Sequence, residues 1–180
     1  MSNYRLTDEQ RSLKEAARRF AENKLRPIAL ETERKGEAMP REALKLMAEN
    51  GYVGLDIPTE YGGLGLDIMG CAVVLEELSS VWFSASTNAM SLLTGPLLVF
   101  GTDEQKQNYL PAISSGNLLT AFALTETDAG SDASSIQTFA ARDGDDWVIN
   151  GRKIYITNGA RAALIVLFAR TDRDAPRGEG

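Results

Sequence analysis

Apolar residues recur at helical spacing from about Leu13 to Phe20, with charged side chains on the opposite face. Thr7 precedes this pattern, and Gln10 comes three residues after Thr7. This is the spacing of a capping box, in which each of the two side chains satisfies a free backbone N–H at the helix start. The pattern therefore predicts a first amphipathic helix that ends near Leu25.

Proline and glycine divide the rest of the helical pattern. Pro27 is expected to interrupt or restart the first helix, with a second stretch running from 28 toward 36. Pro40 opens a short helix that Gly51 ends. Residues 68–81 are apolar nearly all round, which is typical of a helix buried in a bundle.

Two further helical segments precede the change of pattern. An apolar stretch over residues 85–100 contains Pro96 and is expected to end at the following glycine. Thr102 and Gln105 repeat the capping box, and the helix that they begin is expected to stop near Pro111.

After Gly116 the apolar pattern has the short period of β-strands. Five short runs are rich in β-branched and aromatic residues: LLTAFAL, QTFAAR, DWVIN, RKIYIT and ALIVLFAR. The dipeptides at 143–144 (Asp-Gly) and 150–151 (Asn-Gly) favour tight hairpins, so we expect antiparallel strands. The sequence predicts an α+β protein, with an N-terminal helical bundle over 1–116 and part of an antiparallel β-barrel-like domain over 117–180.

Composition narrows the possible partners. The chain has 180 residues, of which 43% are hydrophobic and 24% charged, as in ordinary globular proteins. Its 19 basic and 25 acidic residues give a net charge of -6, which makes nucleic acid an unfavourable partner. The polar N-terminus lacks the apolar core of a secretory signal, and no apolar run approaches the roughly 20 residues of a membrane span. We expect a cytoplasmic protein.

The residue types present also limit the chemistry. Cys71 is the only cysteine and histidine is absent, so the sequence predicts no metal site and no Ser-His or Cys-His nucleophile. Acid or base chemistry would have to use carboxylates, Lys or Tyr. Cys71 lies in an apolar run, where we expect it to be buried and inert rather than reactive.

Two segments of the β part are candidates for ligand binding. The loop TETDAGSD, residues 125–132, combines hydroxyls, a glycine and free backbone amides that favour an anion, although the same composition is common in plain turns. In RKIYITNG, alternation along a strand would put Tyr155 and Thr157 on one face. This face could stack on a planar ligand and hydrogen-bond to its edge, or the two side chains could form an ordinary packing pair.

Together, AFALTETDAGSD and WVINGRKIYITNG resemble the flavin-binding signature of the acyl-CoA dehydrogenase family. The likeness covers the whole chain, because LTDEQ, IPTEYGGLGLD and GTDEQKQNYLP occur in the family's order. It implies FAD as the cofactor, acyl-CoA as the substrate and an electron-transfer flavoprotein as the partner. The family's usual oligomers imply a homo-oligomer, or completion of this chain by another.

The resemblance also implies which residues line the cofactor. Backbone groups near Leu124 and the Thr125 hydroxyl face the pyrimidine end of the flavin, and Ser131 lies by the pyrophosphate and close to the acyl-CoA. Tyr155 takes the place of an aromatic that packs on the isoalloxazine ring, and Thr157 that of a hydroxyl near flavin N5. The implied cofactor-binding residues are Phe122, Ala123, Leu124, Thr125, Glu126, Gly130, Ser131, Tyr155, Ile156 and Thr157.

Two positions depart from the family pattern. Phe122 stands where some members have Tyr, and Thr127 where many have Pro, so the loop keeps its length but loses a fixed φ. Neither change removes one of the hydroxyls expected to contact the cofactor, and we expect binding to survive both.

The family reaction is oxidation of an acyl-CoA thioester to its trans-2-enoyl product, by removal of an α proton to a base and a β hydride to flavin N5. The family's catalytic Glu lies on a helix of a C-terminal domain beyond Gly180, so the resemblance implies a truncated chain with an exposed sheet edge and no catalytic residue of its own. Glu126 is not expected to be the base. Of Glu76 and Glu77, we expect one to be a paired structural charge and the other exposed.

Two alternatives stay open. The same fold could serve an acyl-CoA oxidase or a flavin monooxygenase, in which reduced flavin reacts rapidly with oxygen. The chain could also be a non-catalytic half that binds acyl-CoA or FAD, or supports a partner chain.

Overall fold

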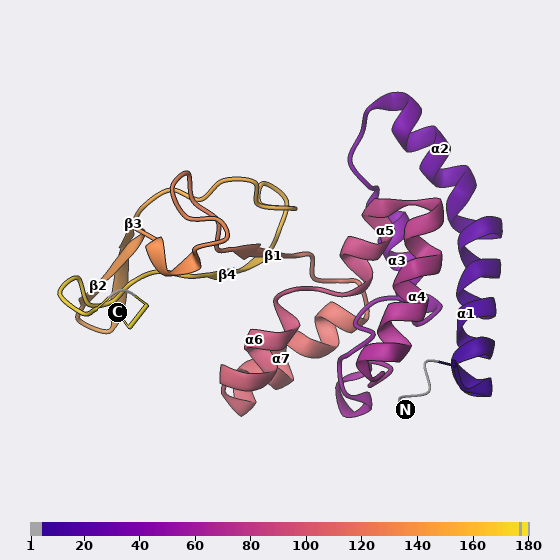
Figure 1. The fold of residues 1–180 in the computed structure, drawn as a ribbon, viewed down its shortest axis with the longest axis horizontal. Coiled ribbons are helices and arrows are strands. Elements are labelled where there is room, and N and C mark those ends of the chain that lie inside the picture. The colour runs from indigo at the N-terminus through magenta and orange to yellow at the C-terminus, as the bar shows by residue number, and fades with distance from the viewer. Residues whose placement is uncertain (1–4, 177, 180) are drawn as a thin grey trace. The chain divides into compact units, whose positions relative to one another are not determined.

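The computed structural model describes residues 5–176 and 178–179. The chain has an α+β fold and divides into two compact units, Met1–Leu118 and Leu119–Gly180 (Figure 1). The first unit is helical, and the second contains the four strands found among the described residues. Among the described residues, no helix combines the length and apolar character needed to cross a membrane.

The first unit begins with three consecutive helical segments: α1 (Asp8–Phe20), a π-helical turn η1 (Ala21–Leu25) and α2 (Arg26–Lys35). The capping box at Thr7 and Gln10 is confirmed, with both reciprocal hydrogen bonds at 3.1 Å. Pro27 lies in the first turn of α2, where the π-helical turn ends and the α-helix resumes, so the restart predicted there is confirmed.

The other helices of this unit are α3 (Arg41–Glu49), α4 (Ile68–Val81), α5 (Phe83–Ala89), α6 (Thr94–Phe100) and α7 (Asp103–Ser114). The helix predicted over 68–81 and the capping box at Thr102 are both confirmed. The expected burial of this helix holds for one face only, because Ile68 and Met69 are exposed. Between α3 and α4, a glycine-rich loop buries Leu55 and Ile57 and contains a short 3-10 helix, η2 (Thr59–Tyr61).

Two helix boundaries differ from the prediction. The single stretch expected over 85–100 is two helices, because Met90 is extended with φ -121° and Pro96 falls in the first turn of α6, where it breaks no bond. α7 does not stop near Pro111 but continues to Ser114. Burial of Ile113 and Ser114 in the last turn favours the longer helix despite the hydrogen bond that Pro111 removes.

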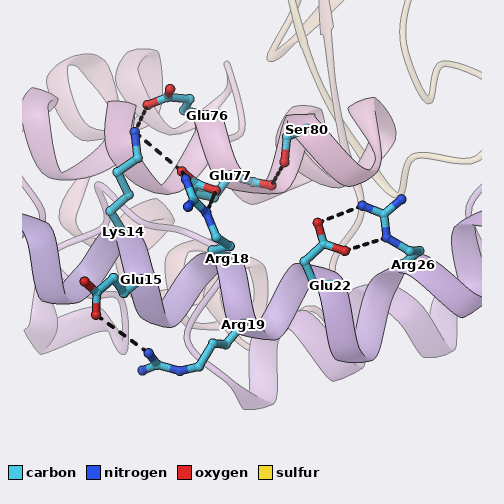
Figure 2. A network of polar contacts seen from close by, with 9 residues as sticks. All are labelled: Lys14, Glu15, Arg18, Arg19, Glu22, Arg26, Glu76, Glu77 and Ser80. Carbon is cyan, nitrogen blue, oxygen red and sulfur yellow. Dashed lines mark hydrogen bonds and ion pairs between the residues drawn. The ribbon is translucent and has the colours of Figure 1, made fainter.

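A group of ion pairs joins α1 to α4 (Figure 2). Arg18 donates two hydrogen bonds of 2.8 Å to the carboxylate of Glu77, and Lys14 donates one of 2.6 Å to Glu76. Glu77 is buried and Glu76 is exposed, so the expectation of one paired structural charge and one exposed charge is confirmed. The hydrogen bonds from Arg18 hold the pKa of the Glu77 carboxyl below its usual range, against the effect of burial.

The strands of the second unit, in the part that the structure describes, are β1 (Thr120–Ala123), β2 (Phe139–Asp143), β3 (Asp146–Asn150) and β4 (Leu164–Leu167). β2 and β3 form the antiparallel hairpin predicted at Asp143-Gly144, with Gly144 at φ 62° in the turn. β1 and β4 pair in parallel, with Thr120 opposite Leu164. The expectation of antiparallel strands throughout was therefore wrong for this pair. Alternation of side chains is the same in both directions and does not reveal strand direction.

The segment RKIYIT is not a strand, and this prediction was also wrong. Tyr155 within this segment has a φ of 56° and Asn158 directly after it a φ of 62°, both in the left-handed region and not in the extended region of a regular strand. The hairpin expected at Asn150-Gly151 is likewise absent. Gly151 is needed for space instead, because a Cβ there would lie 2.3 Å from the Thr138 hydroxyl oxygen.

Candidate functional site

The loop after β1 is the first candidate segment from the sequence. Glu126 and Ala129 exchange backbone hydrogen bonds of 2.9 and 3.3 Å, which closes a tight turn. Gly130 follows with nothing within 4 Å of the position a Cβ would take, and Ser131 is exposed. The loop therefore presents Gly130 and Ser131 outward, next to a turn fixed by its own backbone.

The side chain of Glu126 points into the protein and is the centre of a buried polar cluster. Its carboxylate accepts hydrogen bonds from the backbone N–H of Gln137 at 2.6 Å and of Thr138 at 2.9 Å, and from the Thr138 hydroxyl. Lys153 Nζ lies 2.8 Å from Oε1 of Glu126, and both side chains are buried, at 8% and 7% exposure. Protein donors thus occupy both oxygens of this carboxylate.

These contacts determine the protonation state of Glu126. Burial raises the pKa of its carboxyl, but hydrogen bonds from Lys153, Thr138 and Gln137 outweigh burial and lower the pKa to about 2. At neutral pH the residue is an ionised, fully paired carboxylate. It is a poor candidate for a general base, whose pKa should lie near the working pH.

Lys153 connects the two candidate segments. Besides Glu126, its Nζ donates to the backbone oxygen of Leu124 at 2.9 Å. The next residue, Ile154, donates its backbone N–H to the oxygen of Thr125 at 3.0 Å. The structure therefore brings the loop after β1 and the segment around Tyr155 side by side, as a shared site requires.

Among the large hydrophobic residues of the second unit that the structure describes, Tyr155 is the most exposed, with 91% of its surface open. A turn follows directly, in which the oxygen of Asn158 accepts backbone hydrogen bonds from Arg161 and Ala162, each at 2.8 Å. Thr157 is exposed and Ile156 is half-buried. Because this segment is not a strand, the predicted shared face of Tyr155 and Thr157 does not follow from alternation.

The remaining predicted site residues lie in or beside β1. Ala123 is buried, and the Phe122 ring packs on Phe168 with 5.0 Å between ring centroids. Leu124 and Thr125 are half-buried at the end of the strand. Among residues 5–176 and 178–179, the hydroxyls of Thr125, Ser131 and Thr157 make no hydrogen bond, so all three are available to a ligand.

Lys153 and Thr138 belong to the same cluster, but the sequence did not single them out. Lys153 stands inside a predicted strand and Thr138 at the start of another, where both residue types are common on exposed faces. The cluster depends on contacts between residues up to 29 positions apart, which a single sequence does not record.

Two family models match nearly the whole chain. The acyl-CoA dehydrogenase N-terminal domain matches residues 7–117, and the acyl-CoA dehydrogenase middle domain matches residues 121–180. The chain belongs to the acyl-CoA dehydrogenase family. The boundary between the two matches lies where helices give way to strands, and the candidate site lies in the acyl-CoA dehydrogenase middle domain.

A curated relative, the short-chain specific acyl-CoA dehydrogenase of Clostridium acetobutylicum, is 42% identical over 177 residues. The match covers 95% of this chain and 46% of the relative. The chain thus spans about half the length of the curated relatives it matches.

Solved structures agree with the family match. A chain in a structure described as the electron transferring flavoprotein of Acidaminococcus fermentans is 41% identical, with a TM-score of 0.84 over 95% of this chain and 46% of that one. The FAD complex of PigA is 30% identical, with a TM-score of 0.86 over 96% of this chain and 46% of that one. This chain therefore shares its fold with the matching part of a protein whose FAD complex has been solved.

Proposed function

We propose that this chain forms the flavin-facing part of an FAD-dependent acyl-CoA dehydrogenase. The intact enzyme would oxidise an acyl-CoA thioester to the trans-2-enoyl-CoA, with a base to take the α proton and flavin N5 as the acceptor for the β hydride. The observation that carries the proposal is the juxtaposition of two segments. The loop over 125–131 and the segment over 153–157 are joined by Lys153 and by the Ile154 to Thr125 hydrogen bond.

The groups available at this juxtaposition fit FAD. Tyr155 offers an exposed aromatic ring for a flat heteroaromatic system, and the free hydroxyls of Thr125 and Thr157 offer hydrogen bonds to its edge. Ser131 and the open space at Gly130 suit a diphosphate, because backbone approaches an anion closely where no Cβ intervenes. A negatively charged, planar ligand matches this donor set.

Each residue has an assigned role in the proposal. The Tyr155 ring would pack on the isoalloxazine. The Thr125 hydroxyl and the backbone near Leu124 would face its pyrimidine end, and Thr157 would serve the N5 side. Ser131 serves the pyrophosphate and the acyl-CoA. Glu126 contributes without contact, since its carboxylate is used within the protein.

The chemistry divides between cofactor and protein. When bound, FAD supplies the acceptor for the hydride, and the protein supplies position and electrostatic field. The α proton of a thioester is weakly acidic, so the carbonyl must be polarised by hydrogen bonds while a carboxylate takes the proton. We assign that base to none of Glu76, Glu77 and Glu126, because the first is exposed and the other two are held ionised by basic partners.

Partners follow from the same proposal. Acyl-CoA is the substrate, and an electron-transfer flavoprotein takes the electrons from the reduced flavin. We also propose that the chain works in a homo-oligomer or together with another chain. A cytoplasmic location completes the proposal.

Titration of the purified full chain with FAD tests the proposal. We expect the flavin fluorescence to be quenched and its absorbance bands to shift on binding, because an aromatic side chain would stack on the ring. Tyr155→Leu should weaken binding, whereas Trp147→Leu should not. Trp147 is the matched control, because it is a half-exposed aromatic of the same unit that lies in β3.

Two outcomes would favour the alternatives. Rapid peroxide formation when oxygen meets the reduced flavin would indicate an oxidase or a monooxygenase of the same fold. If the protein acquires no bound flavin when FAD is added, either by itself or together with a partner chain, its role would be non-catalytic and the proposal would be overturned.

A further inference from the structure

The backbone at Tyr155 is strained. A non-glycine residue at φ 56° is uncommon, and for a bulky side chain this conformation persists only where the surroundings impose it. Contacts of the ring contribute little to imposing this conformation, because 91% of the residue is exposed. The restraint must therefore come from the chain on either side of Tyr155.

Both sides are held. Toward the C-terminus, Asn158 is also left-handed, and its oxygen closes the following turn through two backbone hydrogen bonds. Toward the N-terminus, Ile154 is bonded to Thr125, and Lys153 reaches into the interior to Glu126 and to the oxygen of Leu124. The deepest of these attachments is the Lys153 ion pair.

We propose that the buried pair of Glu126 and Lys153 is a positioning device that holds Tyr155 in its left-handed, outward conformation beside the loop over 125–131. This role goes beyond the proposed flavin site and rests on it, because the position matters only if the ring meets the cofactor there. Neither member of the pair touches the ligand. Both act through the backbone of Tyr155 and Thr125.

The chemistry of the pair suits this role. Glu126 also accepts two backbone N–H groups and the Thr138 hydroxyl, so its carboxylate has one orientation. The Lys153 ammonium donates both to that carboxylate and to the backbone oxygen of Leu124. These two bonds fix the ammonium group relative to the loop over 125–131. Buried ion pairs are a weak source of stability but leave few alternative arrangements when every group is satisfied.

Lys153→Met in the full chain tests the role, with Arg152→Met as the matched control. Arg152 is the neighbouring basic residue and is exposed. In Lys153→Met we expect faster hydrogen exchange at the Ile154 amide and FAD binding weaker by roughly tenfold or more, because the aromatic anchor is displaced. Arg152→Met should stay within about twofold of the wild type in both measurements.

A second variant separates positioning from simple loss of stability. Tyr155→Gly removes the steric cost of the left-handed conformation, because glycine adopts it freely. If the pair opposes that strain, losing the pair in the wild type also releases the strain. Lys153→Met should therefore lower the melting temperature more in the Tyr155→Gly background, where there is no strain to release, than in the wild type. Equal losses in the two backgrounds would overturn the positioning role, since a merely structural pair would be indifferent to residue 155.

The outcomes distinguish this inference from the proposed function. Wild-type protein that binds no FAD would overturn the proposed function and the role of the pair in it. Wild-type binding with an unchanged affinity and flavin spectrum in Lys153→Met would overturn the positioning role and leave the flavin site standing. Weaker FAD binding in Lys153→Met, faster hydrogen exchange at the Ile154 amide and unequal melting-temperature losses with and without Tyr155→Gly would together support the flavin site and the positioning role.

Discussion

Arg18 on α1 donates two hydrogen bonds to the carboxylate of Glu77 on α4, one from Nε and one from a terminal nitrogen, both at 2.8 Å (Figure 2). The carboxylate is buried while much of the arginine faces solvent. A buried carboxylate is tolerated only when it is paired and hydrogen-bonded, so Glu77 on α4 depends on Arg18 on α1. This contact therefore joins the two helices.

Glu77→Gln should destabilise the helical unit. The variant loses charge-assisted hydrogen bonds from Arg18 and the 3.4 Å ion pair with Lys14, for an expected cost of about 1 to 3 kcal/mol in free energy of unfolding. Chemical denaturation followed by far-UV circular dichroism measures this loss.

The neighbouring residue supplies the control for this prediction. Glu76 also pairs with Lys14, at 2.6 Å, but its side chain is 64% exposed. Glu76→Gln should leave the denaturation midpoint almost unchanged, because exposed ion pairs contribute little. Similar losses in the two variants would show that burial of Glu77 is not what matters.

Acid should weaken the second unit through Glu126. The folded pKa of this carboxyl is lowered from 4.5 to about 2, so the group binds protons more weakly in the folded state than in the unfolded state. Its contribution to stability is complete above pH 4.5 and falls away as the pH drops toward about 2. Denaturation curves recorded across this window, monitored through Thr138 amide exchange, measure the loss.

Glu126→Gln isolates this contribution from the other carboxylates. The variant should be less stable than the wild type at neutral pH, and the gap should narrow as the pH falls from 4.5 toward about 2. Parallel pH profiles for the two proteins would mean that Glu126 keeps an ordinary pKa in the folded state.

The helices of this protein were largely predictable because their signals are local. The capping boxes at Thr7 and Thr102 and the apolar run of α4 involve neighbours within one or two turns. The errors came where packing outweighed local preference. Pro111 lies inside α7, where the buried Ile113 and Ser114 keep the last turn helical.

The candidate site was only half predictable for the same physical reason. The loop over 125–131 and the residues around Tyr155 were chosen correctly as neighbours, since the family resemblance implied both. The strand assigned to RKIYIT was wrong, because β-branched and aromatic residues favour strands locally while Lys153 and Asn158 impose a different path through distant contacts. Burial of Glu126 against Lys153 is a tertiary event with no local signal.

Gly151 and Gly130 should respond oppositely to replacement by alanine. In Gly151→Ala the new methyl would lie 2.6 Å from Cβ and 2.7 Å from Cα of Thr138. Thr138 is buried and bonded to Glu126, so it has no free space to move into. We expect a loss of about 1 to 3 kcal/mol, as for overpacked interiors.

Gly130→Ala places its methyl in open space, at a backbone conformation that is not left-handed. Its stability should therefore match or slightly exceed that of the wild type, because alanine restricts the unfolded chain more than glycine does. FAD affinity should nevertheless fall if a diphosphate uses that space. Unchanged affinity in a well-folded Gly130→Ala protein would place the diphosphate elsewhere, since an added methyl cannot share a position with a bound phosphate oxygen.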